Sequence, residues 1–150
     1  AQVSPTPTPD LGTPPVTSNC SVKGPLIDCT SSGNQSGKIY LITCEYTDVD
    51  GNMTPNQARV RVAAEYPSGS TSIQEAALDP INLVGDGFSG TATLPFCIGF
   101  ANEPSVTLSL TFIDANGLPS NTETVPIVAS SSTNQEAESS PFITLIDYIP

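Results

Sequence analysis

The 150-residue sequence contains no histidine and no tryptophan. Without histidine the chain has no Ser–His or Cys–His nucleophile pair, no imidazole base and no histidine metal ligand. The one enzyme class that needs only Asp and Glu is a two-carboxylate glycosidase, and no tryptophan is present to stack on a sugar. We therefore expect no enzymatic activity. A glycosidase ranks third among the functional hypotheses, after the two non-enzymatic ones given below.

Positive charge is also scarce, because Lys23, Lys38, Arg59 and Arg61 stand against 15 Asp and Glu and leave a net charge of −11. Such a chain repels phosphate backbones and anionic lipid headgroups, so we expect no nucleic-acid partner. No run of about 18 apolar residues exists that could span a membrane. Any self-assembly must come from packing or strand pairing.

Helix-forming sequence is rare in a chain with 15 prolines and 11 glycines, and short alternating segments dominate. Residues 38–46 are apolar on both parities, which predicts a central strand covered on both faces, whereas 57–66 and 105–113 alternate cleanly. Residues 114–117 predict a turn before a return strand at 122–129, Pro95 predicts a bulge or strand end, and 70–83 predicts a loop or edge strand. The pattern predicts an all-β antiparallel sandwich.

The two ends of the sequence differ from its body. Residues 1–18 form a Pro/Thr-rich extended arm, 19–129 the sandwich, 130–140 a flexible polar linker, and 141–150 a terminal apolar strand. The start at Ala1 is compatible with a mature protein whose signal peptide has been removed.

Four cysteines, Cys20, Cys29, Cys44 and Cys97, lack the two-residue spacing of a zinc knuckle. We expect two disulfides, Cys20 with Cys29 and Cys44 with Cys97, and therefore an extracellular or cell-surface protein. Free buried thiols in a cytosolic protein are the alternative.

The segments YTDVDGN…RVRV and LTFIDANGLPSNTETVPI resemble the repeated Ig-like modules of bacterial cell-surface proteins, over about residues 37–129. The resemblance implies an immunoglobulin-like β-sandwich that acts as a spacer, adhesin or fibre subunit. The sequence departs from the antibody pattern, because it has no core tryptophan and Cys97 precedes the penultimate strand.

A weak candidate calcium site combines Asp48, Asp50 and Asn52, since a tight acidic turn gathers three oxygens. The full twelve-residue calcium loop is absent, so a plain hairpin turn is the preferred interpretation, and we expect no cofactor.

Glycans are the expected covalent additions. Three sequons predict N-glycosylation at Asn19, Asn34 and Asn52. The Pro/Thr-rich arm adds possible O-glycans at Thr6, Thr8 and Thr13.

The terminal strand PFITLIDYIP carries apolar groups on both parities: Phe142, Ile143, Leu145, Ile146, Tyr148 and Ile149. It could be one more strand of its own sandwich, or a donor strand that inserts into a neighbouring copy and builds a head-to-tail homopolymer. The first functional hypothesis is therefore a structural subunit of an extracellular, glycosylated filament, with the N-terminal arm as the other possible link. The second is a monomeric adhesin or carbohydrate-binding module of a larger surface protein.

Overall fold

The computed structural model describes residues 12–30, 36–100, 103–129 and 141–146. These residues form ten strands and no helix. The strands are β1 (Val16–Lys23), β2 (Asp28–Thr30), β3 (Ser36–Thr47), β4 (Arg59–Glu65), β5 (Thr71–Ala77), β6 (Leu83–Gly85), β7 (Ser89–Gly99), β8 (Ser105–Ile113), β9 (Pro119–Val128) and β10 (Phe142–Leu145).

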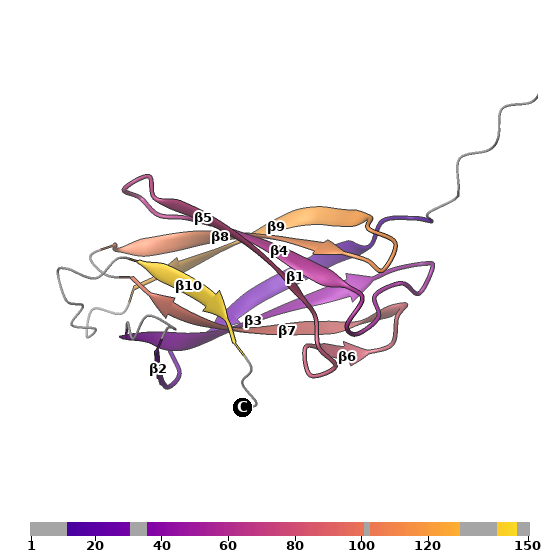
Figure 1. The fold of residues 1–150 in the computed structure, drawn as a ribbon, viewed down its shortest axis with the longest axis horizontal. Helices are drawn as coiled ribbons and strands as arrows, with labels where there is room; N and C mark the ends of the chain where they lie inside the picture. The colour runs from indigo at the N-terminus through magenta and orange to yellow at the C-terminus, as the bar shows by residue number, and fades with distance from the viewer. Residues whose placement is uncertain (1–11, 31–35, 101–102, 130–140, 147–150) are drawn as a thin grey trace, which may run out of the picture.

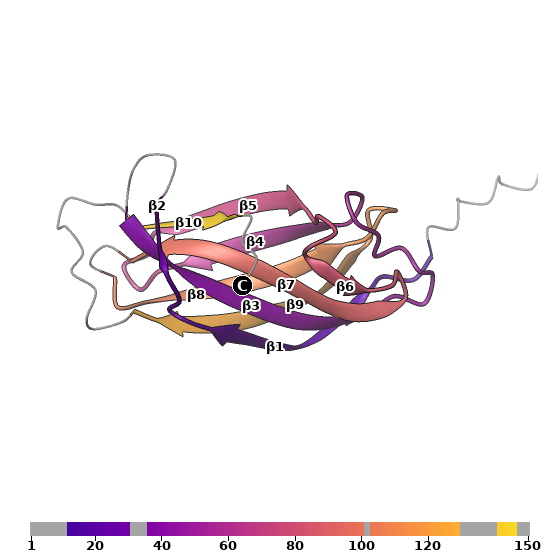
Figure 2. The ribbon, with the colours of Figure 1, turned by 90° about the horizontal axis from the view of Figure 1, so that it is seen from below.

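Two antiparallel sheets pack face to face (Figure 1). The first has the order β1-β3-β7-β10, with β2 also paired to β3 and β6 to β7, and the second has the order β5-β4-β8-β9. Figure 2 shows β1 beside β9 along one lateral side of the sandwich and β10 beside β5 along the other. The predicted all-β sandwich is confirmed.

Alternation explains why the second sheet is buried on one face. In β4, Val60, Val62 and Ala64 are buried, while Arg59 and Arg61 on the alternate parity are exposed. Strand β8 alternates in the same way and contributes Val106, Leu108, Leu110 and Phe112 to the core. The predicted inward parity of both strands is confirmed.

Strand β3 is buried on both faces, as predicted. Tyr40 and Ile42 point into the core between the sheets, while Ile39 and Leu41 on the other face are 3% and 7% exposed. The chain between β1 and β2 runs along the outside of β3, where Leu26 N donates to Ile39 O at 2.8 Å. Because backbone hydrogen bonds between strands lie in the plane of the sheet, this segment continues the edge beside β3 between β1 and β2.

The predicted disulfide pairing is wrong. The bridges join Cys20 to Cys44 and Cys29 to Cys97. Strand β1 lies antiparallel to β3, with Ser21 opposite Thr43, and this register brings Cys20 to Cys44. Strands β2 and β7 both pair with the first residues of β3, which brings Cys29 to Cys97.

Three local predictions also need correction. Residues 48–52 do not close a hairpin, because β3 and β4 belong to different sheets and this segment crosses between them. The first strand begins at Val16, inside the predicted arm, because its pairing with β3 starts at Thr47. Pro95 neither ends β7 nor produces a bulge: the register with β3 is continuous from Lys38 to Thr47.

Pro95 is tolerated because its nitrogen faces away from β3. Its carbonyl accepts from Ile146 N at 2.9 Å, on the side where β10 lies, and N–H and C=O of one residue share a side in an antiparallel strand. Strand β6 pairs with β7 up to Ala92 and β10 pairs with it from Phe96, so Pro95 falls in the gap between them. No ladder hydrogen bond is lost there.

Candidate functional site

The C-terminal strand lies at the outer edge of the first sheet. Strand β10 pairs antiparallel with the last four residues of β7, from Phe142 opposite Gly99 to Leu145 opposite Phe96. Ile143 is 3% exposed and belongs to the core, whereas Thr144 on the alternate parity is exposed. Strand β10 thus fills an edge that would otherwise expose unpaired backbone groups and an open seat in the core.

Phe142 fits against β7 and β3 because two glycines leave room for its ring. A Cβ added at Gly99 would collide with the Phe142 ring, and one at Gly37 would lie 3.0 Å from Phe142 Cζ. The two glycines therefore leave a surface without side chains beneath the aromatic ring. Glycine at these two positions leaves room for a large side chain at the first position of β10.

A second contact holds β10 to the opposite sheet. Gln74 in β5 donates its side-chain amide to the carbonyl of Ile143. Glu75, the next residue in β5, accepts from Arg59 at 2.9 Å and lies 3.6 Å from Arg61. The hydrogen bond from Arg59 is the main cause that lowers the pKa of Glu75. These contacts fix the edge strand that faces β10.

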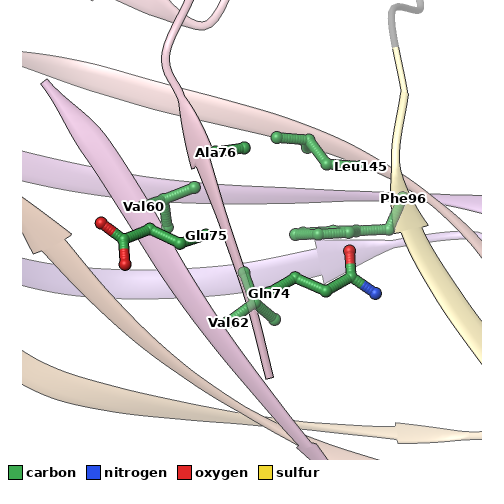
Figure 3. Close-up of a pocket in the computed structure, with 7 residues that line it drawn as sticks. All are labelled: Val60, Val62, Gln74, Glu75, Ala76, Phe96 and Leu145. Atoms are coloured by element: carbon green, nitrogen blue, oxygen red, sulfur yellow. The ribbon is translucent and has the colours of Figure 1, made fainter. Parts of the chain in front are cut away.

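A small hollow opens between β5 and β10 (Figure 3). Its lining residues are Val60, Val62, Gln74, Glu75, Ala76, Phe96 and Leu145. Figure 3 shows the Leu145 side chain beside Ala76 and the ring of Phe96 facing Gln74. The lining comes from strands of both sheets, so this lateral side of the sandwich is not closed by packing alone.

The other lateral side is closed more fully. Asn121 in β9 accepts from Thr17 N at 2.8 Å and donates to Thr17 O at 2.9 Å, so one amide bridges β1 and β9 as a strand would. Thr17 is 1% exposed. The β5–β10 side, with one side-chain amide bond and a hollow, is the more open of the two.

The terminal strand predicted from the sequence is only partly within the described residues. Phe142, Ile143 and Leu145 are placed in β10 and Ile146 just after it, whereas Tyr148 and Ile149 lie outside the described residues. Pairing with β7 of the same chain is the arrangement expected of an ordinary sandwich strand.

The candidate calcium residues have separate roles in the structure. Asp48 is 1% exposed and its Oδ1 accepts from Asp50 N at 3.0 Å. The exposed Asp50 carboxylate accepts from Thr13 N, and the carbonyl of Asn52 accepts from Ala115 N at 2.9 Å. Within residues 12–30, 36–100, 103–129 and 141–146, no group of three or more His, Cys, Asp or Glu is placed to hold a metal ion.

The predicted glycosylation positions differ in exposure. Asn19 is exposed at an irregularity in β1, where its side chain donates to Glu45, and Asn52 is half-buried. Thr13 is exposed. Asn34, Thr6 and Thr8 lie outside the described residues.

Three residues of interest were missed by sequence reasoning. Gly99 and Gln74 contact β10, yet nothing in their local sequence marks them, because the contacts depend on strand register. Asp114 was assigned to a turn, which is correct, but its burial beside Asp48 was not foreseen. The repeat of an Asp two residues before Asp or Asn and Gly, at 48–51 and 114–117, was the available signal.

Comparison with known proteins found no matching family model and no match among curated proteins or solved structures. Among the described residues, no helix is long and apolar enough to cross a membrane.

Proposed function

We propose that this chain is a structural subunit of an extracellular, glycosylated filament of immunoglobulin-like domains. In this filament β10 of one copy pairs with β7 of the next, in the seat that it occupies in its own sandwich here. The observation that carries the proposal is that β10 is an edge strand whose Ile143 side chain is buried in the core. Its covalent connection to β9 runs through residues 130–140.

The length of the connection favours exchange between copies. In its own sandwich the chain must pass from β9, at one edge, to β10, at the diagonally opposite edge. The diagonal across three strand spacings of about 4.8 Å and one sheet spacing of about 10 Å is roughly 17 Å. Eleven residues reach about 36–40 Å when extended, so the connection is long enough to reach a neighbour.

The start of β1 and the end of β9 lie at opposite ends of the long axis of the sandwich. Strand β1 begins at one end, and β9 ends and β10 begins at the other (Figure 1). A contact between different surfaces of consecutive copies does not close on itself by a two-fold axis and extends into a filament. This polarity suits head-to-tail addition.

The proposed location rests on the two disulfides, since such bonds persist in oxidising compartments. Asn19 is the most accessible sequon position among the described residues and is the first N-glycan site to examine. An intact mass equal to that of the bare 15.5 kDa chain would contradict glycosylation.

The test compares the full chain with a chain that ends at residue 140. Removal of residues 141–150 should abolish filaments in electron micrographs, and the truncated chain should bind a synthetic peptide of residues 141–150. The same peptide with Ile143→Asp is the control and should not bind, because a charge would enter the core seat. Filaments that persist unchanged after truncation would sink the proposal.

A second candidate is a monomeric adhesin or carbohydrate-binding module. The pairing of β10 with β7 of its own chain favours it, because the domain is then complete without a partner. Size-exclusion chromatography with light scattering separates the two: a discrete 15.5 kDa species at every concentration supports the module, and polymers support the filament subunit.

A further inference from the structure

Two turns from different sheets meet at the end of the sandwich where β3 and β8 finish. Asp48 follows β3, and its Oδ1 accepts from Asp50 N at 3.0 Å. Asp114 follows β8, and its Oδ1 accepts from Asn116 N and Leu118 N, both at 2.9 Å. Each aspartate thus uses one carboxyl oxygen to close its own turn.

The second oxygen of each carboxyl group is buried and unpartnered. Asp48 and Asp114 are 1% and 2% exposed, and Oδ2 of each has no hydrogen-bond partner among the described residues. Ala115 N donates to Asn52 O at 2.9 Å between the two turns, and, after burial, the neighbouring Asp114 carboxyl group raises the pKa of Asp48. If both were ionised, two buried charges of the same sign would lie side by side with two acceptors unsatisfied.

Among the described residues, the ionisable groups that act on Asp48 are both acidic. They are Asp114 and Asp50. In the neighbouring β6–β7 turn, Asp86 accepts from Phe88 N and Ser89 N within its own turn. Burial is the largest cause that raises the pKa of Asp48, and Asp114 raises it further.

We propose that Asp48 and Asp114 share one proton, so that a carboxyl–carboxylate hydrogen bond joins the two sheets at this end and breaks when the pair loses that proton. The O–H of the protonated carboxyl group donates to the free oxygen of the other carboxylate, so both oxygens gain a hydrogen-bond partner. A calcium ion would need six to eight oxygen ligands, and the described residues offer no third carboxylate in position. This inference does not depend on the filament.

The sign of the pH dependence follows from the raised pKa of Asp48. A folded-state pKa above the unfolded value means that the folded protein binds the proton more tightly, so stability is highest in acid. The contribution of the pair to the free energy of unfolding is fully present at pH values below the ordinary pKa of Asp. It is lost as the pH rises through the folded-state pKa of Asp48. The Asp48–Asp114 pair therefore stabilises the domain more in acid than at neutral pH.

The test is the melting temperature of wild type and Asp48→Asn from pH 3 to pH 8. An asparagine can accept from Asp50 N and permanently donate to Asp114, so it imitates the protonated pair. The melting temperature of wild type should fall relative to that of Asp48→Asn as the pH rises, by about 4 °C or more. Glu65→Gln removes one exposed negative charge elsewhere and should keep the wild-type profile.

A second measurement covers the case in which Asp48→Asn does not fold. Carboxyl carbon NMR on the wild-type protein should show that Asp48 titrates above the ordinary Asp range. Two ordinary titrations, or parallel pH profiles for wild type and Asp48→Asn, would overturn the shared proton. A rise in wild-type melting temperature on adding calcium at pH 7, absent in Asp48→Asn, would replace it with a cation site.

Discussion

At the scale of single residues, the pairing of β10 with β7 depends on Gly99, which has no side chain. Gly99→Ala should weaken the pairing of β10 with β7, because the new methyl group collides with the Phe142 ring. Overpacking of this kind costs about 1–3 kcal/mol. Urea unfolding of the full chain measures the loss of stability.

The control for this substitution is its combination with Phe142→Ala. Once the ring is removed, Gly99→Ala should cost much less, which a double-mutant cycle reports as a coupling free energy. An equal cost of Gly99→Ala in both backgrounds would show that the methyl group disturbs β7 itself and not the docked strand.

The residue scale also shows where sequence reasoning stops. The parity of Val60, Val62 and Leu108 could be predicted, because alternation is a local property of a strand. The contacts of Gly99 with Phe142 and of Asp48 with Asp114 join residues far apart in sequence. They depend on register and on sheet order, which local patterns do not contain.

At the scale of strands, each disulfide joins two strands of the first sheet that are distant in the sequence. Strand β2 has three residues, and Cys29–Cys97 ties it to β7 across a separation of 68 residues. Cys20–Cys44 ties β1 to β3 across 24 residues. In the loop-entropy model, the longer bridge stabilises by about 4.4 kcal/mol and the shorter by about 3.5 kcal/mol.

Replacing Cys29 and Cys97 together by serine should therefore destabilise the domain more than replacing Cys20 and Cys44. Guanidinium unfolding of the two double variants measures both costs, with the wild-type protein under the same oxidising conditions as reference. Peptide mapping without reductant provides the independent control. A Cys20–Cys29 peptide in the wild-type digest would contradict the observed pairing.

The disulfide error has a physical origin at the same scale. Proximity in sequence favoured Cys20 with Cys29, but β1 and β2 follow one another along the same edge of β3 and do not pair with each other. The 71–77 segment shows the same limit: its helix-like pattern left a loop and an edge strand as alternatives, and pairing of all seven residues with β4 makes it an edge strand. Neighbouring strands decide such cases.

At the scale of the whole molecule, net charge opposes assembly. Each copy carries −11 at neutral pH, and of its few cations Arg59 and Arg61 are already engaged by Glu75 and Lys38 by Asp28. Attraction between copies must then come from strand pairing and burial of Ile143, neither of which needs opposite charges. Repulsion between exposed charges is screened over about 10 Å at 0.1 M salt and about 3 Å at 1 M.

Polymer formation by the proposed strand exchange should therefore increase with salt at pH 7. Light scattering after chromatography at about 0.05 M and about 1 M sodium chloride measures the fraction of polymer. The variant Glu65→Gln/Glu123→Gln, with two fewer negative charges, should reach the same fraction at lower salt, while the chain ending at residue 140 should stay monomeric throughout. A fall in polymer with rising salt would mean that ion pairs between copies hold the filament, which a burial-driven strand exchange does not predict.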